Sequence, residues 1–126
     1  MRDIKFRAWE KKLKEIIPVK NIDFEAKMIN KDSIWRKFDE IQLMQYTGLK
    51  DKNDKEIYEG DIVEITWAYD KSIHKFKVYY DSENAYYSLK EIGRDDLDVL
   101  CGYSKEQIEI IGNIYENPNL LKETCQ

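Results

Sequence analysis

The sequence predicts a small, mainly β protein in which short antiparallel strands close into a barrel. Apolar and polar residues alternate with a period of two over much of the chain, which is typical of strands with one buried face. Short polar turns separate these strands, as in an antiparallel meander. Hydrophobic residues make up 42% of the chain and aromatic residues 13%, enough to form a folded core. One or two short helices complete the prediction.

The N-terminal part, residues 1–42, is predicted to be rich in β-structure. An alternating run from Ile4 to Ala8 predicts a strand that begins near the first residue. Residues 15–19 are expected to return beside it as a hairpin. Pro18 places that returning strand at the edge of a sheet or at a strand end, because proline has no N–H to donate.

Three further segments lead from this part into the predicted barrel domain, residues 43–126. Residues 22–28 alternate and predict another strand with two different faces. Trp35 and Phe38 fit either a short helical turn or a strand, and the sequence leaves both alternatives open. The run from 41 to 46 is apolar enough for a strand that crosses into the barrel.

The stretch from Leu43 to Val63 is predicted to organise the fold. A strand leads through a charged turn at 50–55 to Gly60, where glycine permits a tight corner before the next strand. The expected structural motif consists of Tyr46, Gly48, Ile57, Tyr58, Gly60, Asp61 and Val63. We expect the side chains of Tyr46, Ile57, Tyr58 and Val63 to be mostly buried.

The rest of the chain continues the meander. Acidic residues precede apolar ones in 94–101, which favours helical turns there, and Pro118 suits a first helical position. The predicted elements are strands at 62–67, 74–80 and 85–89, helical turns at 94–101 ended by Gly102, a strand at 106–115 with a bend or close backbone approach at Gly112, and a terminal helical turn at 118–122 capped by Asn117.

Charge is distributed unevenly along the chain. The net charge is −4, but residues 1–38 carry +5 and residues 39–126 carry −9. The acidic majority disfavours a general nucleic-acid binder. No apolar run is long enough for a membrane span or a signal sequence, so we expect a cytoplasmic protein with no membrane partner.

Three blocks of sequence resemble the YopX protein family of phage and prophage proteins. They are MRDIKFRAW, LMQYTGLKDKNDKEIYEGDIV and IIGNIYENPNLL, in the order that the family has them. The resemblance implies an SH3-like barrel with an added N-terminal β-rich part, in the cytoplasm of a bacterium that carries a phage. It implies no assigned biochemical activity. One departure is Asn53-Asp54, where the family commonly has Asn-Gly in the turn.

No pattern in the sequence predicts an enzyme. His74 is the only histidine, no serine or cysteine partner is implied for it, and we expect it to face solvent or lie in a turn. Cys101 and Cys125 have the wrong number and spacing for zinc, so reduced thiols are expected. Residues 51–56 resemble the start of a calcium loop, but a lysine and a glutamate disrupt it. We therefore expect no catalytic residue, metal or cofactor.

Two functional hypotheses remain. The first is a non-enzymatic phage accessory protein that acts by protein association, either as a homo-oligomer through residues 1–38 or with a phage or host partner. Its candidate interaction surface is Trp9, Ile17 and Trp35.

The second hypothesis is a single-stranded nucleic-acid-binding module. Its candidate face combines cations with aromatic rings: Lys75, Lys77, Tyr79 and Tyr86. The alternative is that the tyrosines of this region alternate between the core and the outside, as is ordinary in strands. The balance of −9 over residues 39–126 disfavours this second hypothesis unless the cations are segregated.

Overall fold

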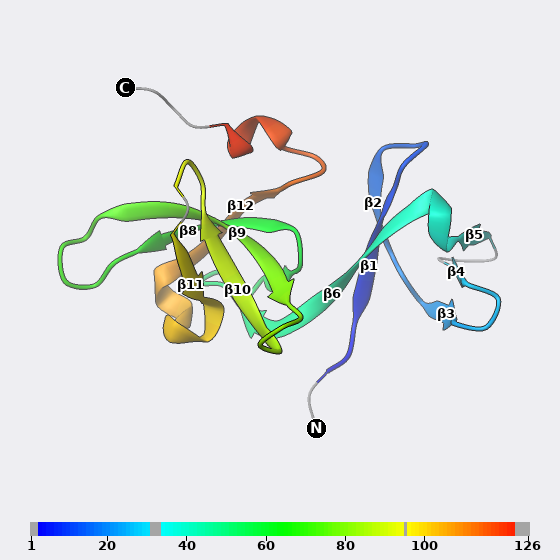
Figure 1. Cartoon of the computed structure of the whole chain (residues 1–126), viewed down its shortest axis with the longest axis horizontal. Helices are drawn as coiled ribbons and strands as arrows, with labels where there is room; N and C mark the ends of the chain where they lie inside the picture. The colour runs from blue at the N-terminus through cyan, green and yellow to red at the C-terminus, as the bar shows by residue number, and fades with distance from the viewer. Residues whose placement is uncertain (1–2, 31–33, 95, 123–126) are drawn as a thin grey trace. The chain divides into compact units, whose positions relative to one another are not determined.

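The computed structural model describes residues 3–30, 34–94 and 96–122, and the chain forms two compact units, Met1–Tyr46 and Thr47–Gln126 (Figure 1). The described residues form short antiparallel strands and 3-10 turns, so the mainly β prediction is confirmed. The division falls inside strand β6 (Ile41–Lys50), which contributes to each unit. No helix in the described ranges has the length and apolarity to cross a bilayer.

The N-terminal unit contains two small sheets. Its elements are β1 (Phe6–Glu10), β2 (Glu15–Pro18), β3 (Asn21–Asp23), β4 (Met28–Asn30), β5 (Trp35–Lys37), the 3-10 turn η1 (Phe38–Glu40) and the first part of β6. Strand β1 pairs with β2 on one side and with β6 on the other, while β3, β4 and β5 form an antiparallel sheet of their own. Its buried core is Ala8, Ile17, Ile29 and Ile41.

The predicted N-terminal hairpin is confirmed. The carboxylate of Glu10, which is only 4% exposed, accepts hydrogen bonds from the backbone N–H groups of Lys12 and Leu13 and thereby closes the turn. Pro18 ends β2 at the edge of its sheet, where a missing N–H leaves no partner strand unsatisfied. The sequence leaves Trp35 and Phe38 open between a strand and a short helical turn. Trp35 lies in a strand, and Phe38 begins a 3-10 turn.

Residues 22–28 do not form the single strand that their alternation predicts. They form the facing ends of β3 and β4, joined by a turn in which Asp23 Oδ1 accepts hydrogen bonds from the N–H groups of Glu25 and Ala26. Lys27 completes the turn with a φ of 57°. Aspartate favours such turns because its side chain satisfies the following backbone donors, and this preference outweighs the apolar pattern.

The C-terminal unit contains a five-stranded curled antiparallel sheet, the paired strands β6 and β7 of a second sheet, and short 3-10 turns. Its elements are the rest of β6, β7 (Glu56–Tyr58), β8 (Asp61–Thr66), β9 (Ile73–Asp81), β10 (Tyr86–Glu91), β11 (Leu97–Val99), η2 (Leu100–Gly102), η3 (Lys105–Gln107), β12 (Ile108–Asn113) and η4 (Pro118–Leu121). The strand order β11-β10-β9-β8-β12 curls into a half-barrel (Figure 1). An SH3-like topology stays a prediction.

The core of this unit lies on the inner face of the curled sheet. Val63 is opposite Phe76, and Leu89 is opposite Val78, so alternate residues of β8, β9 and β10 meet there. The buried core residues are Ile57, Val63, Ile65, Phe76, Val78, Leu89, Leu100 and Ile108. The residues between them on each strand face the outer side.

Three of the four side chains predicted to be buried in the stretch from Leu43 to Val63 are buried. Ile57 and Val63 are fully buried and Tyr46 is 6% exposed. Tyr58 is only half-buried, contrary to expectation. It follows Ile57 in β7, and because neighbouring strand residues face opposite sides, it cannot share the buried face.

The corner at the start of β8 needs a glycine. Gly60 has a φ of 87°, which side chains disfavour, and its N–H donates to the carbonyl of Val78 at 2.9 Å. The buried carboxylate of Asp61 accepts the N–H of Tyr58 at 2.8 Å and braces the same corner. Gly48, within β6, also has a positive φ of 90°.

The charged turn after β6 is organised by Asp51, which is fully buried. Its Oδ1 accepts the N–H groups of Asn53 and Lys55, and its Oδ2 accepts the N–H of Ile110 at 3.0 Å. Burial raises the pKa of this carboxyl, but the three hydrogen bonds outweigh burial and hold the pKa below the ordinary aspartate value. Asp54 has a φ of 63°, a conformation that aspartate tolerates.

The helical turns predicted over residues 94–101 are wrong in their middle part. Leu97–Val99 pairs with β10 as strand β11, and only η2 after it is helical, with Gly102 as its last residue. Ser88 Oγ also donates to the carbonyl of Asp98 at 3.0 Å. The open edge of β10 offers these residues a full set of partners, which outweighs a weak helical pattern.

The C-terminal turn begins at Pro118 as predicted, but Asn117 does not cap it. Asn117 Oδ1 accepts the N–H of Asn113 at 3.1 Å instead. A Cβ added to Gly112 would lie 2.5 Å from that Oδ1, so the close approach at this glycine is to a side chain. Strand β12 also has its irregularity between Ile110 and Gly112, which accounts for the predicted bend.

Candidate functional site

Two lysines lie directly opposite each other on the outer face of the C-terminal sheet. Lys77 on β9 pairs in register with Lys90 on β10. Lys75 precedes Lys77 by two residues and therefore lies on the same face. Like charges directly opposite on neighbouring strands repel, so this pairing costs stability.

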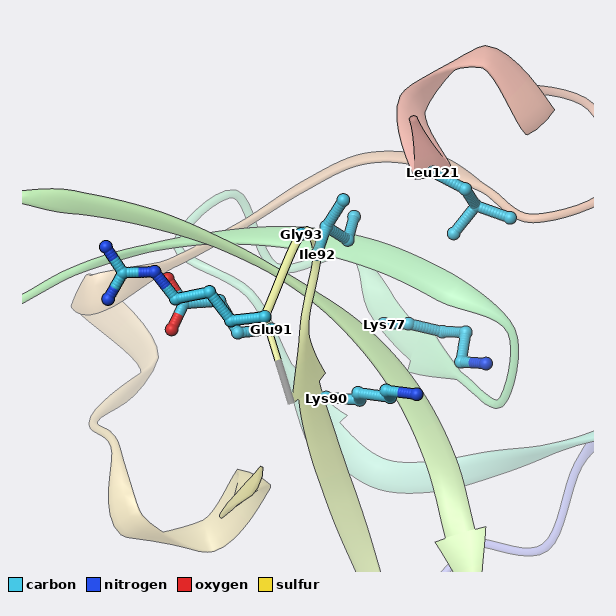
Figure 2. Close-up of a pocket in the computed structure, with 7 residues that line it drawn as sticks. Lys77, Lys90, Glu91, Ile92, Gly93 and Leu121 are labelled. Atoms are coloured by element: carbon cyan, nitrogen blue, oxygen red, sulfur yellow. The ribbon is translucent and has the colours of Figure 1, made fainter. Parts of the chain in front are cut away.

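A cavity of about 450 Å³ opens beside this lysine pair. Figure 2 shows the side chains of Lys77 and Lys90 pointing the same way, with Leu121 of η4 on the same side and Glu91 extending in the opposite direction. A second cavity of about 500 Å³ shares the lining residues from Glu91 to Arg94 and adds Lys75 and Lys122. The two cavities together form one cation-lined surface.

We call the cations of these two cavities the cationic face, which consists of Lys75, Lys77, Lys90, Arg94 and Lys122. They are five of the ten Lys and Arg residues between positions 47 and 122. Among the described residues none of the five forms an ion pair, whereas Lys52 pairs with Glu109 at 3.3 Å and Lys105 pairs with Asp54. Lys75 lies opposite Glu64 on β8, whereas Lys77 and Lys90 have no acid as a strand partner among the described residues. Lys77 and Lys90 are therefore the members best placed to meet an anion.

Glu91 is the one acid among the described residues that line either cavity. Its Oε2 lies 2.9 Å from Nδ1 of His74, on the inner side of the sheet. The carboxylate is thus directed away from Lys77 and Lys90 and is held by the imidazole (Figure 2). This arrangement limits its repulsion of an anion on the outer side.

His74 does not lie in solvent or in a turn, which corrects the expectation from the sequence. It lies on β9 with its side chain only 16% exposed, and its ring stacks on Trp67 with centroids 3.7 Å apart. The signal was present in the sequence, because His74, Phe76 and Val78 continue one alternation and the latter two are core residues.

Ser72, His74 and Glu91 have the order of a nucleophile, a base and an orienting acid. Ser72 Oγ lies 2.8 Å from Nε2 of His74, and Glu91 holds Nδ1. Ser72 Oγ also donates to Asp70 Oδ1 at 2.7 Å. That carboxylate competes with the imidazole for the hydroxyl proton and would repel an oxyanion formed at the serine. We therefore assign the network to holding the β8–β9 turn against β10.

The four residues predicted for a nucleic-acid face lie on one side of the sheet. Lys75, Lys77 and Tyr79 alternate along β9, and Tyr86 lies on the same outer side of β10, an even number of residues before Lys90. Tyr79 is half-buried and Tyr86 is 38% exposed.

The neighbouring tyrosines lie on the other side. Tyr80 and Tyr87 contact each other edge to face with centroids 5.3 Å apart, and Tyr87 packs against the core. The tyrosines thus alternate between the two sides of the sheet.

Three members of the cationic face were missed by sequence reasoning. Lys90 required the register of β10 against β9, which no local pattern reveals. Arg94 lies in the turn after β10, and Lys122 follows η4, so both reach the cavities only through the tertiary fold.

The predicted interaction surface of the N-terminal unit is only partly exposed. Trp35 is 45% exposed and Trp9 is half-buried, but Ile17 is 1% exposed and belongs to the core. The prediction for Ile17 is wrong because Ile16 and Ile17 are both apolar, and the sequence does not tell which of them faces the core. The unit exposes other large apolar side chains: Ile4, Leu13, Phe24 and Ile34.

In the described part of the chain, no group of three or more His, Cys, Asp or Glu side chains is placed to hold a metal ion. Cys101 is exposed and unbridged there. Cys125 lies outside the described residues.

Comparisons with known proteins identify relatives of this chain. The family model for YopX protein matches residues 5–122. The structure of protein EF1440 from Enterococcus faecalis is similar with a TM-score of 0.69 at 26% identity, covering 97% of this chain and 100% of that one. Protein YopX from Bacillus subtilis has a TM-score of 0.64 at 19% identity, covering 99% and 100%, a likeness of fold alone. No curated protein matches the chain.

Proposed function

This chain belongs to the YopX protein family, and we propose that its C-terminal unit binds single-stranded nucleic acid on the outer side of β9 and β10. The observation that carries the proposal is the cationic face, which gathers half of the unit's described Lys and Arg residues around two adjoining cavities, with no ion pair to another described residue. Such a surface supports binding of a polyanion.

In this proposal, the charge close to the two cavities matters more for phosphate binding than the net charge of the unit. The lining residues of the two cavities carry five cations and one carboxylate, and that carboxylate is held by His74. Glu64 on β8, opposite Lys75, adds a second acid close to these cations. At physiological ionic strength, charges more than about 8 Å away are largely screened. Acids elsewhere on the unit therefore weaken phosphate binding less than the total of −9 over residues 39–126 implies.

Tyrosines support a single strand over a duplex as the ligand. Tyr79 and Tyr86 share the side of the sheet that carries Lys77 and Lys90. Unpaired bases stack on exposed aromatic side chains while their phosphates contact nearby cations. A duplex hides the faces of its bases and gains only the phosphate contacts.

Fluorescence anisotropy with a labelled single-stranded oligonucleotide, as DNA and as RNA, tests the proposal. The double substitution Lys77→Glu with Lys90→Glu is expected to weaken binding at low salt by at least about tenfold. Its matched control is Lys50→Glu with Lys55→Glu, which changes the net charge equally at exposed residues that line neither cavity. Absence of wild-type binding at low salt, or equal losses in both double variants, contradicts the proposal.

A second candidate function is protein association through the N-terminal unit. The observation that favours it is the set of large apolar side chains that this small basic unit exposes, including Phe24, Ile34 and Trp35. We propose that these residues contact a second copy of the chain or a phage or host protein. Both proposals suit a non-enzymatic phage accessory protein in the bacterial cytoplasm, the setting that the family resemblance implies.

A further inference from the structure

A third cavity of the C-terminal unit, of about 340 Å³, lies where β8 turns toward β9. That turn and the segment after η2 form its lining, which consists of Trp67, Ala68, Tyr69, Tyr103 and Gln107. We call this cavity the aromatic pocket. Tyr69 is 83% exposed, and its ring stacks on that of Trp67 with centroids 6.1 Å apart. The aromatic pocket shares no lining residue with the two cavities of the cationic face.

The polar groups of this lining are buried or already engaged within the unit. Gln107 donates from Nε2 to the carbonyl of Thr66 at 3.0 Å, and the Tyr103 hydroxyl donates to the carboxylate of Asp98. The Nε1 atom of Trp67 is buried and does not reach a ligand. The aromatic pocket therefore presents ring faces, which favour an apolar or aromatic side chain over a polar ligand.

Three carboxylates flank the aromatic pocket. Asp70 and Glu106 are sequence neighbours of lining residues, and Asp98 accepts the hydrogen bond of the Tyr103 hydroxyl. Burial, this hydrogen bond and the charges of Asp98 and Glu91 raise the pKa of Tyr103 to about 12. The surroundings of the phenol are therefore negative.

Neighbouring lysines compensate only part of this negative charge. Lys71, in the turn between β8 and β9, offsets one carboxylate, and Lys105 is already paired with Asp54. The rim of the aromatic pocket therefore favours a partner that carries a cation beside its apolar side chain.

Strand β5 of the N-terminal unit has this combination. It is an edge strand of its sheet, and Trp35 and Lys37, two residues apart, lie on the same face. Both are exposed, as is Ile34 just before the strand. Residues 1–38 carry +5 and residues 39–126 carry −9, so the two parts of the chain attract each other. A basic, apolar edge of one copy thus complements the acidic, aromatic pocket of another.

We propose that the aromatic pocket receives Trp35 of a second copy of the chain, with Lys37 of that copy beside the carboxylates of the rim. The inference rests on the second candidate function, association through the N-terminal unit, and adds the surface that this unit contacts. Aromatic pairs contribute more than the area they bury, and tryptophan and tyrosine supply much of the binding energy of protein interfaces. Two copies that make the contact reciprocally form a closed dimer.

Sedimentation velocity of the full-length protein at low salt tests the contact with two single variants. Trp35→Ser removes the inserted side chain, and Tyr69→Ser removes an exposed ring of the aromatic pocket. Each is expected to weaken self-association by at least about fivefold. Leu97→Ser, an exposed position outside the aromatic pocket, is the matched control and should associate like wild type. Circular dichroism checks that the variants fold.

Mixing the two variants then tests whether Trp35 and Tyr69 are partners from different copies. With a dye on one variant, the equimolar mixture is expected to form mixed dimers more readily than either variant forms dimers alone. The reason is that Trp35 of one variant meets the intact aromatic pocket of the other.

Two results overturn the assignment of the aromatic pocket while self-association of the wild type stands. They are a Tyr69→Ser variant that associates like wild type, and a mixture that associates no better than its components. A wild-type protein that stays monomeric overturns the inference together with self-association, and leaves a phage or host protein as the partner in the second candidate function.

Discussion

Lys77 and Lys90 lie directly opposite each other on neighbouring antiparallel strands, with their side chains directed to the same side of the sheet (Figure 2). A pair of like charges in this position destabilises a sheet by a few tenths of a kcal/mol to about 1 kcal/mol relative to a neutral pair. We propose that this destabilising pair serves to bind phosphate.

The first prediction is that Lys90→Glu stabilises the protein while it weakens nucleic-acid binding. Replacing a repulsive cross-strand pair with an attractive one should raise the free energy of unfolding by about 0.2–1 kcal/mol. Urea unfolding measures the change, and Lys50→Glu, at the exposed end of β6, is the control for net charge. A loss of stability in Lys90→Glu would show that the two lysines do not repel each other in the folded protein.

The second prediction concerns the core of the C-terminal unit. Ile57→Ala and Val63→Ala should each lower the free energy of unfolding by about 1–4 kcal/mol, since both side chains are fully buried. Ile73→Ala, at a position that is 61% exposed, should change it by less than about 0.5 kcal/mol. Equal denaturation midpoints for the buried and the exposed variants would show that these residues do not form the core.

The third prediction concerns the close approach at Gly112. Gly112→Ala should destabilise the protein by about 1–3 kcal/mol, because the new Cβ would meet Asn117 Oδ1 at 2.5 Å. Gly102→Ala is a matched control, since its Cβ would meet nothing within 4 Å. Adding Asn117→Gly to Gly112→Ala should restore part of the loss, and a purely additive double variant would rule out the steric explanation.

The fourth prediction is a pH dependence due to Asp51. Its pKa is lower in the folded protein than in the unfolded chain, so the stability that it contributes is present above about pH 4 and is lost as the pH falls through the folded value. Asp51→Asn should be less stable than wild type by about 1–3 kcal/mol at neutral pH, and this gap should narrow below about pH 4. Urea unfolding at neutral pH and below about pH 4 measures this difference in stability between the variant and wild type. A constant gap, as expected for the exposed control Asp96→Asn, would contradict the role of the charge.

The fifth prediction is that the full-length protein self-associates through residues 1–38. Sedimentation equilibrium at low salt should detect an oligomer that weakens as added salt shortens the Debye length from about 10 Å to about 3 Å. Ile34→Ser with Trp35→Ser should shift the equilibrium toward monomer, whereas Leu97→Ser, an equally exposed position on the other unit, should not. A full-length protein that stays monomeric at about millimolar concentration, where even weak pairs form, argues against this association.

The alternation of apolar and polar residues predicted a strand correctly where the pattern continued on both sides of a position. The alternation of Phe76 and Val78 placed β9, and the glycine at position 60 placed the corner before β8. Alternation failed at residues 22–28, where a hydrogen-bonded aspartate turn prevailed over the apolar pattern. The helical turns predicted over 94–101 were wrong at 97–99, where pairing with the edge of β10 prevailed over a weak helical pattern.

The candidate site was less predictable than the fold, because its parts converge only in three dimensions. Lys75 and Lys77 could be assigned to one face from the alternation within a single strand. The position of Lys90 on that face depended on the register of β10 against β9. His74 could have been placed on the inner face from its alternation with the core, but its contact with Glu91 spans 17 positions and leaves no local pattern.

The most direct test of nucleic-acid binding is a titration of the isotope-labelled full-length protein with a single-stranded oligonucleotide at low salt, followed through the backbone amide chemical shifts. We predict that the largest shifts fall on Lys75, Lys77, Lys90 and Arg94 and on the neighbouring Tyr79 and Tyr86, and that the control turn at 50–55 is unaffected. Saturable binding whose shifts lie elsewhere, or spectra that do not change at all, would contradict the account.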